Sequence, residues 1–217
     1  MRRAVTAEFL GALLLTAAVV GSGIMGERLA GGNLAVALLA NTAATVAALA
    51  TLIALLGPAS GAHFNPVITL VALWRGEARR GQSIAYIVAQ IAGCCAGAML
   101  ANAMFELPLI QASTQVRTGF SQWLSEAVAT AGLVVVAFSS PTISAAAWRV
   151  SAWIGAAYWF TASTSFANLA ITLGRSLTDS FAGIRPEDAP GFIAAQLVGA
   201  VAGAMLLRLL AERKAAA

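Results

Sequence analysis

Two asparagines, Asn65 and Asn168, stand at corresponding positions in two related segments of the chain. Both segments share the pattern Asn-x-x-Ile-Thr-Leu, and the two copies are 103 residues apart. Asn is a favourable N-cap, and Pro66 occupies the first helical position of one copy, where its missing N–H costs nothing. Each segment therefore predicts a short loop followed by a helix start, with an amide side chain at the helix N-terminus.

The helices that follow these asparagines, near 65–75 and 168–178, are too short to cross a bilayer, which needs about 20 residues. A helix that begins inside the membrane, at matching places in two halves of a chain, is typical of a re-entrant channel or transporter site. Two helix N-termini facing one point oppose a cation by about 3 kcal/mol at about 5 Å and an effective dielectric of about 20. Because asparagine amides also donate N–H groups, such a site favours neutral hydroxylic solutes.

The composition is that of a membrane protein. Of the 217 residues, 59% are hydrophobic and 10% are charged, against about 25% charged in a soluble domain. The net charge of +4 is scattered over the ends of apolar segments, so the lipid bilayer is the expected partner and nucleic acid is not. Six apolar segments have the length of a membrane span, and they lie near 4–25, 33–56, 82–104, 123–140, 144–164 and 190–210.

The two halves of the chain are related well beyond the asparagines. Glu8 opens the first span and Glu126 the fourth, and Gln90 and Gln196 lie at matching positions in the third and sixth spans. We expect one channel domain over 1–217, with repeat 1 at about 1–105 and repeat 2 at about 120–217. Each half holds three spans, an odd number, so the second half enters from the opposite side. The sequence thus predicts an all-α membrane protein with six transmembrane helices and two re-entrant half-helices, arranged as an inverted repeat.

The distribution of Lys and Arg predicts the orientation, because cytoplasmic loops carry an excess of these residues. With both termini inside, nine of them lie on the cytoplasmic side and four outside. We therefore expect a multi-pass protein of the cell (inner) membrane with both termini cytoplasmic. The nine are Arg2, Arg3, Arg75, Arg79, Arg80, Arg149, Arg208, Arg213 and Lys214, and the four are Arg28, Arg117, Arg175 and Arg185.

Glu8 and Glu126 are carboxylates inside membrane spans, where an ionisable group is costly unless it is satisfied. One hypothesis is a proton or cation site; the favoured one is a structural acceptor for N–H groups of the re-entrant loops. His63, the only histidine, has no second histidine or thiolate cluster beside it, so no metal site is expected. No nucleophile and base, phosphate loop or nucleotide motif is visible, so neither a cofactor nor catalysis is expected.

Together these motifs resemble the aquaporin (major intrinsic protein) family, and the resemblance covers essentially the whole chain. It implies a homotetramer with one pore per subunit and passive conduction of water or small neutral solutes. His63, Asn65 and Asn168 would then lie at the pore constriction. The family signature is Asn-Pro-Ala, and neither copy matches it here, because Asn65 is followed by Pro66 and Val67 and Asn168 by Leu169 and Ala170. The resemblance places these four residues at the constriction as well.

The resemblance also implies a selectivity filter. The residue after the second motif is usually Arg in the family and is Ile171 here. By offset from the asparagines, the other filter positions fall on Thr45, Ala156 and Ser165, which would make a wide and fairly apolar filter. The pattern resembles a bacterial subgroup of aquaglyceroporins associated with arsenic resistance. That implies passage of neutral metalloid acids such as arsenous acid, and of glycerol-like polyols.

Two other functions remain open at this stage. One is a water-selective aquaporin, which would need a His and an Arg near the outer mouth. The other is an ion-coupled secondary transporter with inverted repeats, for which Glu8 and Glu126 are the candidate coupling groups. The role of Arg175 also stays open. It lies four residues after Ile171, so it either follows that residue along the pore or forms a salt bridge with Asp179.

Overall fold

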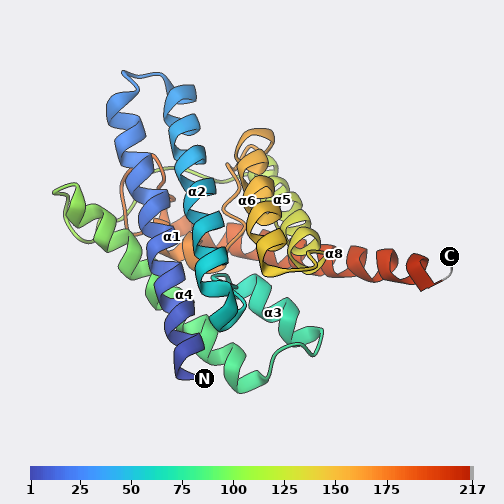
Figure 1. Ribbon diagram of the computed structural model, residues 1–217. Coiled ribbons are helices and arrows are strands. Elements are labelled where there is room, and N and C mark those ends of the chain that lie inside the picture. The colour runs from blue at the N-terminus through green and yellow to red at the C-terminus, as the bar shows by residue number, and fades with distance from the viewer. Residues whose placement is uncertain (216–217) are drawn as a thin grey trace.

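The computed structural model describes residues 1–215, with side chains through residue 210, and these residues form helices and loops without strands. The helices are α1 (Arg2–Leu29), α2 (Leu34–Ser60), α3 (Pro66–Trp74), α4 (Arg80–Met104), α5 (Phe120–Phe138), α6 (Ile143–Phe160), α7 (Leu169–Arg175) and α8 (Ala189–Ala215), with a short 3-10 helix, η1 (Pro186–Asp188), before α8. Figure 1 shows their arrangement. Each predicted span and each predicted half-helix corresponds to one of these helices. The side chains of Arg213 and Lys214, used above to predict orientation, lie outside those described.

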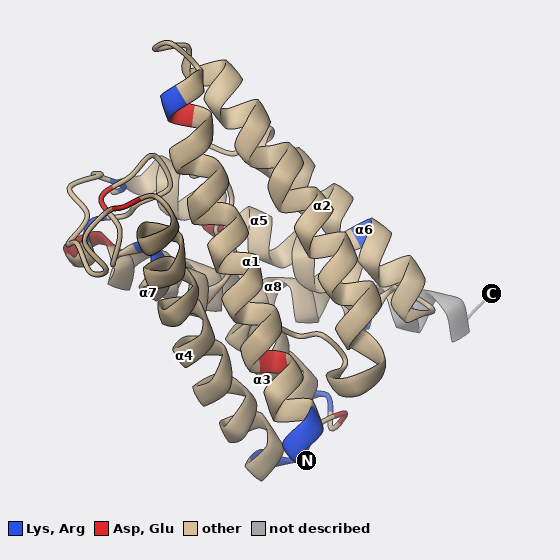
Figure 2. Cartoon of the chain, turned by 60° about the vertical axis from the view of Figure 1, so that its left-hand side comes forward, with Lys and Arg blue, Asp and Glu red and all other residues tan. Residues whose placement is uncertain are grey.

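Six long helices and two half-helices build the membrane domain. Five stretches, α1, α2, α4, α5 and Pro186–Leu210, are long and apolar enough to cross a membrane. The sixth helix, α6, has 18 residues, about 27 Å at 1.5 Å per residue, and Arg149 with its neighbouring tryptophans makes it less apolar. Figure 2 shows that most charged residues gather at the two ends of the bundle and that few lie in its middle.

The two halves use the same close helix contacts. In the first half α4 packs on α1, and in the second half α8 packs on α5. Gly93 and Gly97 bring α4 against the backbone of α1, while Gly199 and Gly203 bring α8 against α5. In lipid, small residues at four-residue spacing allow such close backbone approach. The helix pairs α1 with α4 and α5 with α8 therefore form the framework that supports both re-entrant loops.

Two helices end earlier than the sequence predicts. The segment 144–164 gives a helix that ends at Phe160, and 168–178 gives one that ends at Arg175. After Phe160 the chain turns into the second re-entrant loop, whose N–H groups bind Glu126 instead of continuing the helix. After Arg175, the amide of Asn102 binds the Leu177 carbonyl and draws the chain towards α4. Tertiary hydrogen bonds therefore set both ends.

Replacing Gly97 by Ala is expected to destabilise the protein, because the new Cβ would collide with the Leu13 carbonyl. Overpacking of this kind costs about 1–3 kcal/mol. Gly81→Ala, in the same helix, is the matched control because its Cβ would meet no atom within 4 Å. Unfolding in detergent should show a lower midpoint for Gly97→Ala and an equal or higher one for Gly81→Ala. Equal stability of the two variants would contradict this packing.

Candidate functional site

The two asparagines join the half-helices tip to tip. The Asn65 Oδ1 atom accepts a hydrogen bond from Val67 N at 2.9 Å, and its Nδ2 donates to the Ala167 carbonyl at 2.7 Å. Asn168 repeats this arrangement: its Oδ1 caps α7, and its Nδ2 donates to the Phe64 carbonyl at 2.9 Å. Each side chain therefore caps its own helix and binds the loop of the other half.

The loop before α3 is held by Glu8, whose side chain is fully buried. Its Oε1 accepts hydrogen bonds from Ser60 Oγ at 2.6 Å and His63 N at 3.0 Å. Its Oε2 accepts from Phe64 N and from Gln90 Nε2, both at 2.7 Å. One carboxylate thus satisfies two loop N–H groups that water cannot reach in a membrane.

The loop before α7 is held by Glu126 in the same way. Its Oε1 accepts from Ser163 Oγ at 2.5 Å and from Phe166 N at 2.9 Å. Its Oε2 accepts from Ala167 N at 2.8 Å and from Gln196 Nε2 at 2.7 Å. Each carboxylate is thus engaged by four donors, and neither lines the cavity. This geometry supports a structural role in preference to a proton or cation site.

The backbone of both loops is strained at equivalent positions. Ala62 and Phe64 have φ of 51° and 47°, and Ser165 and Ala167 have φ of 52° and 46°. Left-handed backbone at residues other than glycine costs about 1–3 kcal/mol each and persists where the surroundings dictate it. Here the two carboxylates supply that constraint. As a result, three residues of each loop next to its asparagine line the cavity.

The cavity between the helices has a volume of about 180 Å³. Most of its wall is apolar, with side chains such as Leu15, Leu49 and Leu133. The polar side chains in the wall are few, and they are those of Thr45, His63, Asn65, Tyr158, Ser165, Asn168 and Arg175. The Oγ atom of Ser165 is buried and has no hydrogen-bond partner among the described residues.

Of the predicted constriction residues, His63, Asn65 and Asn168 line the cavity. Pro66, Val67, Leu169 and Ala170, the rest of both motifs, are not among the residues that line this cavity. They belong to the first turns of α3 and α7 and pack behind the asparagines; Val67 and Ala170 are fully buried. Bulk at these positions therefore tightens the protein core and does not narrow the cavity.

Three predicted filter residues, Thr45, Ser165 and Ile171, line the cavity, but the fourth, Ala156, does not. Ala156 is exposed and lies in a shallow groove on the outer face of α5 and α6. The α6 residue in the cavity is Tyr158, whose hydroxyl lies 3.3 Å from Thr45 Oγ1. A two-residue shift turns a side chain by about 200° on a helix, so the offset rule selected the wrong face.

A sequence signal for the correct face of α6 did exist. Ala146, Val150, Ile154 and Tyr158 recur at four-residue spacing, and all four line the cavity. Residues four apart lie on one helical face, so this series marks the inward stripe. Counting from a distant loop, as the offset rule does, ignores that periodicity.

The cavity also contains Arg175, which is 2% exposed. Its guanidinium carbon lies 3.3 Å from the centre of the Phe166 ring, and its Nε donates to the Ala182 carbonyl. Of the two sequence alternatives, the salt bridge to Asp179 is wrong. Asp179 instead accepts hydrogen bonds from Thr114 N and Oγ1, at 2.8 and 2.9 Å. Arg175 follows Ile171 along the wall of the cavity.

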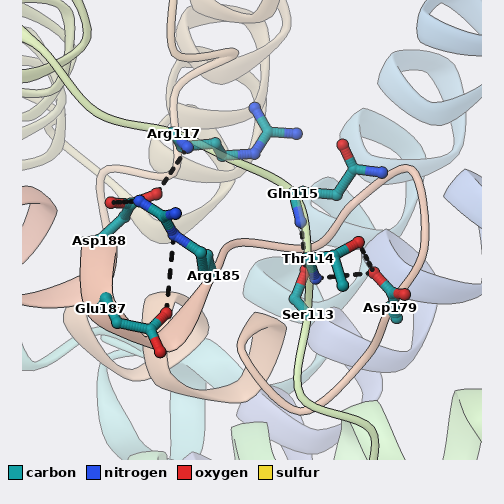
Figure 3. Close-up of polar contacts among 8 residues, drawn as sticks. All are labelled: Ser113, Thr114, Gln115, Arg117, Asp179, Arg185, Glu187 and Asp188. Carbon is teal, nitrogen blue, oxygen red and sulfur yellow. Dashed lines mark hydrogen bonds and ion pairs between the residues drawn. The ribbon is translucent and has the colours of Figure 1, made fainter.

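Two segments that follow α4 and α7, 105–119 and 176–188, hydrogen-bond to each other, and Arg175 donates to the second of them at the Ala182 carbonyl. Figure 3 shows the polar contacts between them, including those of Thr114 with Asp179 and of Arg117 with Asp188. The Asp188 carboxylate accepts hydrogen bonds from Arg185 Nη2 and from Arg117 N, both at 2.9 Å. It therefore ties the second segment to the first.

Six spanning helices around a cavity, with two half-helices tied together inside it, define a membrane channel. The chain belongs to the major intrinsic protein family, which matches residues 1–146. It is 51% identical to aquaglyceroporin AqpS of Rhizobium meliloti (strain 1021), over 98% of this chain and 91% of that protein. It is therefore a passive multi-pass channel for small neutral solutes and water.

Other relatives match less fully. The lens fiber major intrinsic protein of Gallus gallus is 41% identical over 105 residues, which cover 44% of this chain and 35% of that protein. The X-ray structure of the aquaglyceroporin from Plasmodium falciparum aligns with a TM-score of 0.74 and 18% identity, over 94% of both chains. This structural likeness confirms the predicted fold.

Glu8→Gln is expected to destabilise the channel. An amide in place of the carboxylate turns an NH₂ group towards loop N–H donors, and each buried donor left unsatisfied costs about 1–3 kcal/mol. Glu27→Gln is the matched control, since Glu27 lies on the same helix and is exposed. Thermal unfolding in detergent should separate the two variants by several degrees. A Glu8→Gln protein as stable as the control would refute the role assigned to this carboxylate.

Proposed function

We propose that this channel conducts uncharged solutes larger than water, namely glycerol-like polyols and neutral metalloid acids such as arsenous acid, together with water. The observation that carries the proposal is an apolar side chain, Ile171, in the cavity wall three residues after Asn168. The relative's printed description as an aquaglyceroporin supports the polyol part.

The asparagine pair provides the central contact for a passing solute. Each Asn65 or Asn168 amide has two N–H donors, and one of them is used in the tie to the opposite loop. One donor per side chain remains for a hydroxyl or water oxygen in the cavity. The N-termini of α3 and α7 each add about half a positive charge, which resists cations. A solute that accepts hydrogen bonds and carries no charge therefore suits this point.

Acceptors lie next to these donors. Among the described residues, no group donates a hydrogen bond to the carbonyls of Gly61, Ala62 or His63, and all three residues line the cavity. A hydroxylic solute can thus donate to the loop while it accepts from an asparagine. The opposite wall is apolar, which suits the carbon skeleton of a polyol. Such a lining replaces part of the hydration shell of the solute.

Four side chains are proposed to form the filter: Thr45, Tyr158, Ser165 and Ile171. Ile171 gives it an apolar side, and the hydroxyl groups give it a polar side. Ser165 Oγ lacks a partner among the described residues, so it is free to bind a solute hydroxyl. A filter without a guanidinium at the Ile171 position is wider and less polar than one built for water alone, which disfavours the water-selective alternative.

The ion-coupled transporter is also disfavoured. Coupling would require a carboxylate that is exposed to the permeation path and can change its charge. Glu8 and Glu126 each have four hydrogen-bond donors and do not line the cavity. Their hydrogen bonds also fix both loops, so a change of charge would release the structure. We assign no catalytic group, metal ion or cofactor to this channel.

Both termini are proposed to lie in the cytoplasm of a cell whose inner membrane holds this chain as a single channel domain. Arg75 stacks on Phe138, Arg149 donates to the Ser139 carbonyl and Arg208 stacks on Trp74, so these arginines share one end of the bundle. The positive-inside rule makes that end cytoplasmic.

A homotetramer is proposed as the assembled form, as the family resemblance implies. Large apolar side chains such as Leu39, Trp148 and Trp159 are exposed on the sides of the single chain. In a membrane this surface is covered by lipid or by another subunit. Each subunit holds its own cavity, so conduction does not depend on a shared central path.

Replacing Ile171 by Arg is expected to reduce glycerol and arsenous acid flux at least tenfold and to reduce water flux less. The longer, charged side chain would fill the apolar side of the filter. The same substitution at Ile110, an exposed loop residue, is the matched control and should leave all fluxes unchanged. Stopped-flow light scattering on proteoliposomes measures the three fluxes. If Ile171→Arg conducts glycerol as the parent protein does, Ile171 lies outside the filter.

A further inference from the structure

Arg175 is a cation in the cavity wall that is not part of the proposed filter. It is the last residue of α7, four residues beyond Ile171, and therefore lies about 6 Å further along the same helical face. Both residues line the cavity. Because Asn168 is the N-cap of α7, Arg175 lies on the far side of Ile171 from the asparagine pair, where the chain continues into segment 176–188.

Arg175 makes no ion pair among the described residues. Its Nε donates to the Ala182 carbonyl and its plane covers Phe166, so the side chain is held in place by neutral groups. Its two terminal nitrogens make no hydrogen bond to the described part of the chain. A guanidinium cannot be deprotonated in a protein, so the cavity wall carries a fixed positive charge.

A second guanidinium strengthens this charge. Arg117 lies over the same Phe166 ring, 5.2 Å from its centre, and donates to the Gly183 and Phe181 carbonyls at 2.7 and 3.1 Å. The nearby buried carboxylate, Glu126, is directed to the loop N–H groups and to Gln196. Arg117 and Arg175 thus lie near one carboxylate, Glu126, and all four hydrogen bonds of that carboxylate are made with other groups.

The charge breaks the symmetry between the two halves. Ile171 has its counterpart 103 residues earlier in Ile68, and both line the cavity. The counterpart of Arg175 is Ala72, which is buried and lines no part of the cavity. Both halves therefore place an isoleucine in the cavity wall, whereas the fixed charge of Arg175 belongs to the second half alone.

We infer that Arg175 is a second cation barrier of this channel, placed one helical turn beyond the filter and separate from the half-helix N-termini. The inference rests on the proposed function and deepens it, because solute size and solute charge are then selected at different levels. Ile171 leaves the filter wide for uncharged solutes, and Arg175 rejects cations one turn of α7 further from the asparagines. The half-helix N-termini form the other barrier, at the asparagines.

The test compares charge and solute permeation in the same proteoliposomes. Arg175→Met should raise potassium and proton flux, read with trapped ion-sensitive dyes, by about 10- to 100-fold at a pore distance of about 8 Å. Its glycerol flux should stay within about threefold of the parent value. Arg175→Lys keeps the charge and should keep the ions out. Arg149→Met, on an exposed residue outside the cavity, is the control and should change neither flux.

The outcomes separate the two proposals. If glycerol passes all variants and Arg175→Met remains closed to ions, the barrier is not at Arg175 and the proposed function stands. If the parent protein passes no glycerol, the proposed function fails whatever Arg175 does. If Arg175→Met does not insert, Arg175→Gln decides, because it keeps a donor for the Ala182 carbonyl without the charge. A Gln variant that conducts glycerol and excludes ions would overturn the inference.

Discussion

Backbone that enters a bilayer without crossing it brings N–H groups to a place where water cannot bind them. In this protein two buried carboxylates, Glu8 and Glu126, meet that requirement, each at the start of a repeat. Every other feature of the pore depends on these contacts. They hold residues in left-handed backbone without glycine, they align loop carbonyls beside the cavity, and they fix where α3 and α7 begin. Gln90 and Gln196 link the same carboxylates to the half-helices through Thr69 and Thr172.

In the proposed function, the asparagine pair is the place where this framework selects between solutes. Each amide group caps a helix and binds the opposite loop, and in the proposed function its second N–H donor binds a solute. Because the tie is reciprocal, neither half-helix can move without the other. Two helix N-termini then stay directed at one place, and their partial charges add. In the proposed function, the half-helix N-termini and Arg175 favour neutral solutes, while the side chains of the filter select solutes by size.

Much of this could be predicted from the sequence, because a duplicated pattern carries its own check. The six spans, both half-helices, the asparagines and the paired glutamates all recur in the same order in both halves, so each copy supports the other. The filter lacked that support. Ala156 was placed by counting across a loop, and the error of two residues moved it to the outer surface, whereas Tyr158 belongs to an inward stripe with its own periodicity.

Arg175 could not be assigned from sequence for a related reason. Ile171, which lines the pore, and Asp179, the candidate salt-bridge partner, are each four residues from Arg175. The choice between them depends on loop 105–119, which occupies Asp179 through Thr114. No periodicity predicts the course of such a loop. Val67 and Ala170 illustrate the same limit, since a motif identifies a helix start but does not tell which of its residues face the cavity.

The most direct test is the flux of glycerol through the unmodified protein in proteoliposomes, measured by stopped-flow light scattering with and without a proton gradient. A passive channel with a preformed cavity predicts a flux that is proportional to the glycerol gradient, does not saturate at modest concentration and is unchanged when the proton gradient is collapsed. A flux that saturates, or that appears only when a proton gradient is applied, would contradict this account and favour an ion-coupled transporter.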